Sequence, residues 1–111
     1  MSAPFHVEHD PAGFVEVPVA GTLSRTMHQD DDLKVIVFGF AAGEELSEHT
    51  ASRPALIQVL SGALELTLDG ETVHADPGSW VHMSAGLRHA VRALTPAVML
   101  LTLVRRGAAA E

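Results

Sequence analysis

The chain has 111 residues, a formal net charge of −7, 47% hydrophobic residues and no cysteine. This predicts one domain with a real core and excludes disulfides, thiolate metal sites and a cysteine nucleophile. The acidic balance argues against binding to a nucleic-acid backbone, no apolar run approaches the ~18–20 residues of a membrane helix, and the N-terminus lacks the pattern of a signal peptide. We therefore expect a cytoplasmic protein that binds neither nucleic acid nor membrane.

Short strands separated by turn residues are predicted along the first part of the chain. Residues 13–19 alternate and contain Pro18, which favours an edge strand. A second strand at 22–29 is followed by the acidic stretch Asp30–Asp32, which we expect to be a solvated turn. Residues 33–40 are β-branched and aromatic, and this composition predicts a third strand.

The same alternation continues to the end of the chain. Leu64, Leu66 and Leu68 alternate with polar residues, so they should be buried, together with Val81 and Met83 of a later strand. No window keeps a helical period without a Gly or Pro break. The chain thus predicts a single domain (1–111) that is an all-β antiparallel sandwich or barrel. The later strands are predicted at 55–60, 63–70, 71–75, 79–84, 89–94 and 97–104, before a flexible tail at 105–111.

A glycine at each end frames a strand-like segment that has one histidine before an apolar run. Gly43, His49 and Gly62 match the pattern G-x5-H-x-H-x3-E-x6-G in register. This spacing resembles the first motif of the cupin superfamily, whose members are small jelly-roll barrels. Ala51 stands at the position of the second histidine of the motif, and Ala55 stands at the position of its glutamate.

A second segment resembles the other cupin motif, G-x5-P-x-G-x2-H-x3-N. Gly78, Gly86 and His89 match it, whereas Ser84 replaces the proline and Ala93 the asparagine. With both motifs, the resemblance implies an antiparallel jelly-roll barrel over residues 33 to 104.

The resemblance also implies a metal site, since three histidines and one carboxylate suit Mn, Fe, Ni or Zn. In this chain only His49 and His89 stand at ligand positions of the two motifs, and the resemblance implies that both point into the barrel interior. Firm binding needs a further donor, and His82 and Gln58 are the additional candidates. Strand alternation turns both of these side chains to the outer face, unless a bulge shifts the register.

Other side chains have simpler expected places. His74 precedes a turn and should face solvent, and Trp80 is expected in the core or at a subunit interface. Glu48 and Arg53 are expected to flank the barrel mouth as solvated charges.

Three functions remain open from the sequence. The first is a metal-assisted enzyme acting on a small molecule, and the second is a binding module that holds a small organic ligand in a barrel pocket lined by His49 and His89. The third is a structural or regulatory dimer with a vestigial metal site. No nucleophile elbow or Gly-rich phosphate loop is present. A homodimer is expected because the strands at 33–40 and 97–104 are apolar on both faces.

Overall fold

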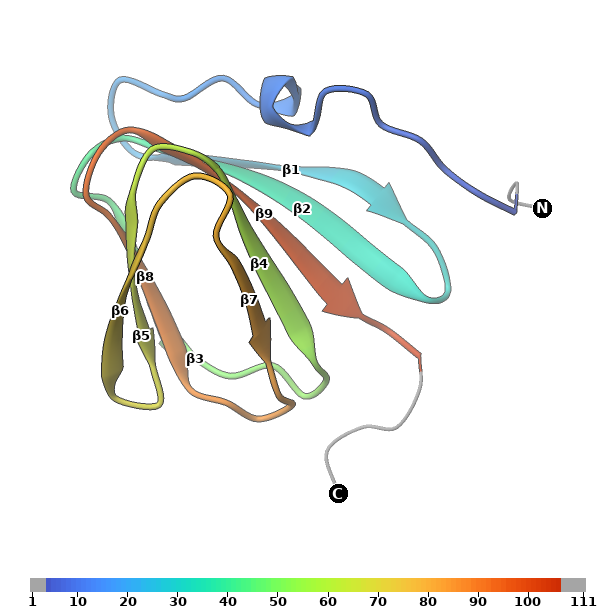
Figure 1. Ribbon diagram of the computed structural model, residues 1–111. Helices are drawn as coiled ribbons and strands as arrows, with labels where there is room; N and C mark the ends of the chain where they lie inside the picture. The colour runs from blue at the N-terminus through green and yellow to red at the C-terminus, as the bar shows by residue number, and fades with distance from the viewer. Residues whose placement is uncertain (1–3, 107–111) are drawn as a thin grey trace.

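The protein, seen in a computed structural model that describes residues 4–106, consists of two antiparallel β-sheets packed face to face (Figure 1). A five-stranded sheet has the order β1-β2-β9-β4-β7, and a four-stranded sheet has the order β3-β8-β5-β6. The expected all-β antiparallel jelly roll is confirmed. The elements are η1 (Pro11–Phe14), β1 (Thr22–Gln29), β2 (Leu33–Phe40), β3 (Glu45–His49), β4 (Ala55–Ser61), β5 (Leu64–Leu68), β6 (Glu71–Ala75), β7 (Trp80–Met83), β8 (His89–Ala93) and β9 (Ala97–Val104).

The main hydrophobic core lies between the two sheets. Leu64, Leu66 and Met83 are fully buried there, as the alternation predicts. Leu68 and Val81 are half-buried and pack against the margin of the same core. Each fully buried leucine or methionine contributes about 1.5–3 kcal/mol to stability through loss of contact with water, so these strands hold the two sheets together.

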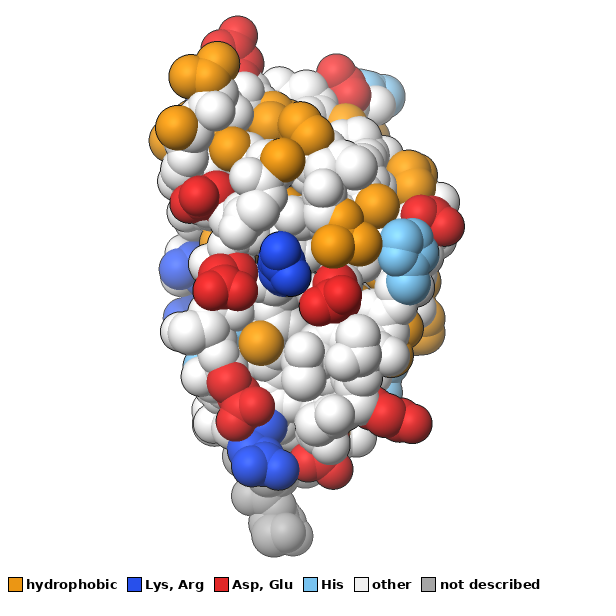
Figure 2. Space-filling view, turned by 90° about the vertical axis from the view of Figure 1, so that its left-hand side faces the viewer, with side chains coloured by type: hydrophobic (Ala, Val, Ile, Leu, Met, Phe, Trp, Pro, Cys, Tyr) orange, Lys and Arg blue, Asp and Glu red, His pale blue; other side chains and the backbone are white. Residues whose placement is uncertain are grey.

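The outer face of the four-stranded sheet is polar. The strand register aligns Glu45 with Arg92, Arg92 with Glu65, and Glu65 with His74. Figure 2 shows this face with acidic, basic and histidine side chains in a row across its middle. His74 is exposed, as expected, and its Nε2 lies 2.8 Å from the Asp76 carboxylate.

The prediction of a strand at residues 13–19 is wrong. Asp10 instead caps a 3-10 helix by accepting a hydrogen bond from the Gly13 N–H (3.2 Å), because Asp followed by Pro favours a helix start. Beyond the helix the chain crosses the outer face of the five-stranded sheet. Val15 is buried there in a second, smaller core cluster, and Gly39 leaves room for the backbone to pass.

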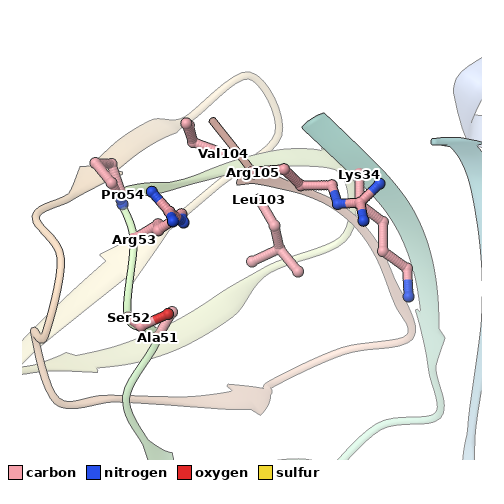
Figure 3. A pocket seen from close by; sticks show the side chains of 8 residues that line it. All are labelled: Lys34, Ala51, Ser52, Arg53, Pro54, Leu103, Val104 and Arg105. Carbon is pink, nitrogen blue, oxygen red and sulfur yellow. The ribbon is translucent and has the colours of Figure 1, made fainter. Parts of the chain in front are cut away.

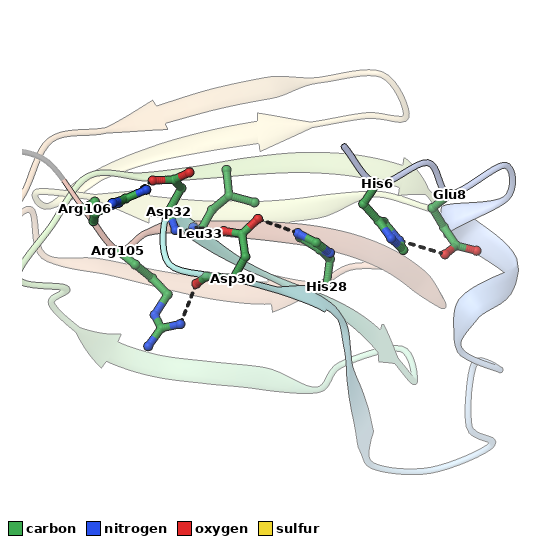
Figure 4. A network of polar contacts seen from close by, with 8 residues as sticks. All are labelled: His6, Glu8, His28, Asp30, Asp32, Leu33, Arg105 and Arg106. Atoms are coloured by element: carbon green, nitrogen blue, oxygen red, sulfur yellow. Dashed lines mark hydrogen bonds and ion pairs between the residues drawn. The ribbon is translucent and has the colours of Figure 1, made fainter. Parts of the chain in front are cut away.

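The acidic turn Asp30–Asp32 is more structured than the sequence suggests (Figure 4). Asp30 is half-buried, and its Oδ1 accepts hydrogen bonds from the N–H groups of Asp32 (2.8 Å) and Leu33 (3.0 Å). The His28 ring donates to its other oxygen at 2.8 Å. The hydrogen bond from His28, followed by those from the two backbone N–H groups, lowers the pKa of Asp30 from 3.8 to about 2.

This turn also receives the end of the last strand. The N–H of Arg105 donates to Asp32 O (2.7 Å) and its guanidinium to Asp30 O (2.6 Å). Arg106 forms an ion pair with the Asp32 carboxylate at 2.6 Å. Of the tail expected at 105–111, residues 107–111 lie outside the described part of the chain.

Trp80 is not a core residue. It is 63% exposed on the outer face of β7, because Val81 and Met83 take the inward positions of that strand. The other expectation for this side chain, a place at a subunit interface, stays a prediction.

Candidate functional site

The two motif histidines lie side by side where β3 ends and β8 begins, and these strand ends are at the lower end of the barrel in Figure 1. β3 ends at His49 and the neighbouring strand β8 begins at His89, and the register pairs these two residues directly. A bulge between Leu46 and His49 shifts the pairing just before this point. The two imidazole ring centroids are 4.1 Å apart, and the ring planes are inclined by 59°.

The two rings differ in exposure. His89 is only 5% exposed, and it shares the inward face of β8 with the buried Val91 and Ala93. His49, at the last position of β3, is exposed. The pair therefore presents one shielded and one accessible imidazole at the rim of the barrel.

Both rings are held by the same kind of hydrogen bond. The Nδ1 of His49 lies 2.8 Å from Ser47 O, and the Nδ1 of His89 lies 2.9 Å from Leu87 O. Because a carbonyl oxygen only accepts, each Nδ1 must carry the hydrogen. In the neutral rings the lone pair is then on Nε2, which can accept a hydrogen bond or bind a cation.

The structure does not bring the two additional candidates to this pair. Gln58 and His82 are exposed on the outer face of the five-stranded sheet. The neighbours of Gln58 along β4, Ile57 and Val59, are buried in the inter-sheet core. Strand alternation therefore points Gln58 and His82 outward, as the sequence predicts, and no bulge interrupts the pairing of β4 with β7.

The remaining positions of the first motif have no donor to offer. Ala51 is half-buried beyond the end of β3, and Ala55 is buried at the start of β4. Over residues 4–106 there is no group of three or more His, Cys, Asp or Glu side chains that could hold a metal. A divalent metal held firmly by a protein usually has three or four protein ligands, so this donor set does not fit one.

A cavity of about 380 Å³ opens at the same end of the barrel (Figure 3). Arg53 lies on one side of it and Arg105 with Lys34 on the other, with Leu103 between them. We call it the cationic pocket. Its lining comes from the β3–β4 loop, the end of β9 and the start of β2, and consists of Lys34, Ala51, Ser52, Arg53, Pro54, Leu103, Val104 and Arg105.

The histidine pair and the cationic pocket share one loop. Ala51 follows His49 by two residues, and its carbonyl accepts a hydrogen bond from Gly86 N–H at 2.7 Å, just before His89. Sequence reasoning placed Arg53 at the barrel mouth but missed Lys34 and Arg105. The antiparallel pairing of Lys34 with Leu103 brings them together, and this pairing was not visible from the spacing of the residues.

Comparison with known proteins identifies the family. Residues 36–104 match the family model described as Cupin domain. The chain belongs to the cupin family. The resemblance seen in the two histidine motifs is thereby confirmed, and members of this family commonly bind transition metals. No curated protein matches the chain.

Solved structures show the same fold over nearly the whole chain. A conserved protein of unknown function from Streptococcus pyogenes is 35% identical, with 97% of this chain and 98% of that one covered and a TM-score of 0.83. A cupin superfamily protein from Desulfitobacterium hafniense is 24% identical, with 93% and 94% covered and a TM-score of 0.83.

An enzyme is also among the similar structures. Salicylate 1,2-dioxygenase from Pseudoaminobacter salicylatoxidans is 17% identical, with a TM-score of 0.70, and 84% of this cupin aligns with 28% of that chain. At this identity the likeness concerns the fold alone, which hosts many unrelated functions. Within the described residues, this cupin has no helix long and apolar enough to cross a membrane.

Proposed function

We propose that this cupin is a binding module that holds a small organic ligand at the histidine end of its barrel. The observation that carries the proposal is the pinned histidine pair. Two rings 4.1 Å apart have their Nδ1 atoms engaged by backbone carbonyls, so each neutral ring offers its Nε2 as an acceptor. A few convergent polar groups beside a cavity of several hundred Å³ are typical of small-molecule sites.

A divalent metal such as Mn, Fe, Ni or Zn is, in this proposal, bound only weakly. His49 and His89 alone would hold it, and neither Gln58 nor His82 lies where it could help. The competing function, a metal-assisted enzyme, requires a metal that stays bound through purification. Metal analysis of the purified protein therefore separates the two.

A screen of small molecules tests the binding proposal. Sugars, aromatic compounds and small organic acids are added one at a time, and the melting temperature is measured. We expect a subset to raise the melting temperature of the wild type, since a ligand that binds only the native state stabilises it. His49→Gln should remove the effect, because its exposed ring contacts the ligand, whereas His74→Gln, on the outer face of the same four-stranded sheet, should keep it. A screen without stabilising compounds, or with equal shifts in His49→Gln, would contradict the proposal.

We propose further that the protein is a homodimer and that it is cytoplasmic. The dimer is supported by exposed apolar side chains along one edge of the five-stranded sheet. Leu23 lies on the edge strand β1, opposite Gly39, and the segment with Val17 and Val19 passes over that glycine. Apolar side chains gathered on an edge favour association with a second copy. The cytoplasmic location rests on the sequence alone.

A further inference from the structure

The cationic pocket brings together three of the seven Lys and Arg side chains of an acidic chain. The protein has seven Lys and Arg residues and a net charge of −7, yet Lys34, Arg53 and Arg105 line this one cavity and no Asp or Glu does. Three cations around a concave site create a local positive potential in an otherwise acidic protein. Such a site attracts anions.

Two of these cations keep their charge unneutralised by carboxylates. Within residues 4–106, neither Lys34 nor Arg105 forms an ion pair with an Asp or Glu, and Arg105 donates instead to the backbone oxygen of Asp30. Two arginines outside the pocket are paired with carboxylates: Arg88 lies 3.4 Å from Asp69, and Arg106 lies 2.6 Å from Asp32. Lys34 and Arg105 thus bring to the pocket positive charge that no ion pair with an Asp or Glu of residues 4–106 neutralises.

The walls of the pocket are fixed by backbone hydrogen bonds. The N–H of Val104 donates to Pro54 O at 3.1 Å, which ties the β3–β4 loop to the end of β9. The N–H of Arg105 donates to Asp32 O at 2.7 Å and holds the opposite wall to the acidic turn. A site held in this way loses less conformational entropy when a ligand binds.

The base of the pocket is apolar. Leu103 is half-buried and packs against the inter-sheet core, and Pro54 and Val104 are half-buried beside it. An inorganic ion would leave these side chains in contact with water. A ligand with an apolar body and one negative group would contact both the cations and this base.

We propose that the cationic pocket binds small organic carboxylates, with the carboxylate among Lys34, Arg53 and Arg105 and the apolar body against Leu103. This inference rests on the proposed function, because it names the class of ligand for the same end of the barrel. Charge-assisted hydrogen bonds from Arg and Lys to a carboxylate are about twice as strong as neutral ones, and they give selectivity over uncharged molecules of the same shape.

Calorimetric titration with matched probes tests the inference. Benzoate is compared with benzamide, which has the same size and no charge, and with inorganic phosphate, which has no apolar body. We expect benzoate to bind with a dissociation constant below about 10 mM, more weakly as salt is added, and benzamide and phosphate at least about tenfold more weakly still. Lys34→Gln and Arg53→Gln should each weaken benzoate binding by about tenfold. The matched control Arg92→Gln removes one positive charge on the outer face of the four-stranded sheet and should leave the affinity within about twofold.

Each other result overturns the inference. Equal affinities for benzoate and benzamide would show that charge does not select the ligand, and tighter binding of phosphate would show a site for inorganic anions. Equal losses in Arg92→Gln and Lys34→Gln would show an effect of net charge alone, and a lack of benzoate binding would remove the site. His49→Gln separates this inference from the proposed function. Benzoate binding that depends on Lys34 but not on His49 would uphold the carboxylate site and contradict the role of the histidine pair.

Discussion

The Nδ1 atoms of His49 and His89 each lie within hydrogen-bond distance of the carbonyl two residues earlier in the chain, Ser47 and Leu87. A histidine in such an arrangement has a fixed tautomer and a fixed direction for its other nitrogen. His74 has the opposite arrangement, because its Nε2 faces the carboxylate of Asp76. The ring nitrogen left outside this hydrogen bond is therefore Nε2 in His49 and His89 and Nδ1 in His74.

This difference predicts a spectroscopic result. At a pH where the rings are neutral, long-range ¹⁵N–¹H correlation spectra should show the Nδ1–H tautomer for His49 and His89. His74 should show the Nε2–H tautomer, because a carboxylate accepts the hydrogen bond from that atom. Nε2–H tautomers at both His49 and His89 would mean that the lone pairs point toward the backbone, and the proposed site would lose its acceptors.

Asp30 should make stability depend on acid pH. Its pKa is lowered from 3.8 to about 2, first by the hydrogen bond from His28 and then by the backbone N–H groups of Leu33 and Asp32. A carboxyl with a depressed pKa in the folded state contributes stability above the unfolded pKa and loses it as the pH falls through the folded value. We therefore expect the free energy of unfolding to fall from about pH 4 to about pH 2.

The carboxyl ¹³C shift of Asp30, followed from pH 5 downward, should titrate with a midpoint of about 2. In His28→Gln the midpoint should rise toward 3.8, since the largest cause of the shift is removed, and the acid loss of stability should become shallower. A midpoint near 3.8 in the wild type would show that the hydrogen bonds around Asp30 do not persist in solution.

Among the elements, the turn from β4 to β5 carries the tightest constraint. Gly62 has a φ of 73°, and a Cβ there would overlap the carbonyl oxygen of Pro96 and lie 2.7 Å from the Cα of Ala97. A side chain at this position would therefore be strained in φ and would also push the β8–β9 turn away. Gly43 has a similar φ of 84° but open space around it.

We expect Gly62→Ala to lower the free energy of unfolding by about 2–5 kcal/mol, the sum of backbone strain and overpacking. Gly43→Ala should cost only about 1–2 kcal/mol, because it carries the φ strain alone. Urea unfolding of the two variants gives the comparison. Equal losses would show that the contact between the two turns is not a constraint on the fold.

Most strands followed from the sequence, because alternation and turn residues are local signals. β1, β2, β6 and β9 have the predicted bounds, and β4, β5, β7 and β8 differ from them by one residue or two. β3 was not predicted as a separate strand, because it lies within the strand-like segment that contains His49. The predicted strand at residues 13–19 was wrong, although Val15 and Val17 alternate with polar residues as in a strand. Asp10 and Pro11 instead begin a 3-10 helix, and of the two valines only Val15 is buried.

The candidate site could be predicted only in part. The spacing of the two cupin motifs predicted His49 and His89 as site residues. The alternation of side chains along a strand predicted that Gln58 and His82 point outward. Lys34 and Arg105 are 71 positions apart in the sequence, and neither belongs to a motif. Only the pairing of β2 with β9 brings them to one cavity, and such long-range pairing leaves no local signal in the sequence.

At the scale of the whole molecule, the proposal of a homodimer gives a direct prediction. Light scattering after size exclusion at micromolar concentration should give twice the chain mass of 11.8 kDa. Leu23→Asp should shift the mass toward that of the monomer, because it puts a charge among the exposed apolar side chains of the β1 edge. Leu94→Asp changes an exposed leucine in the β8–β9 turn and should leave the dimer intact. A monomeric wild type would contradict the dimer.

In the proposed function, the barrel end carries two imidazoles for a small ligand and lacks the donors for a firmly held metal. Restoring the missing donors tests whether the two alanine positions face the histidine pair. Ala55 is buried at the start of β4, opposite Met83 of the neighbouring strand, so a glutamate there would enter the barrel. Ala51 lies two residues beyond His49, and we expect a histidine there to reach the same place.

The most direct measurement is calorimetric titration of Mn²⁺, Ni²⁺ and Zn²⁺ into the wild type and into the double variant Ala51→His, Ala55→Glu. We predict weak wild-type binding that is lost in His49→Ala and in His89→Ala, with an affinity in the double variant higher by about 100-fold or more. Tight binding of one metal ion per chain by the wild type would contradict the proposed function, since it would require a donor that the structure does not place beside the histidine pair.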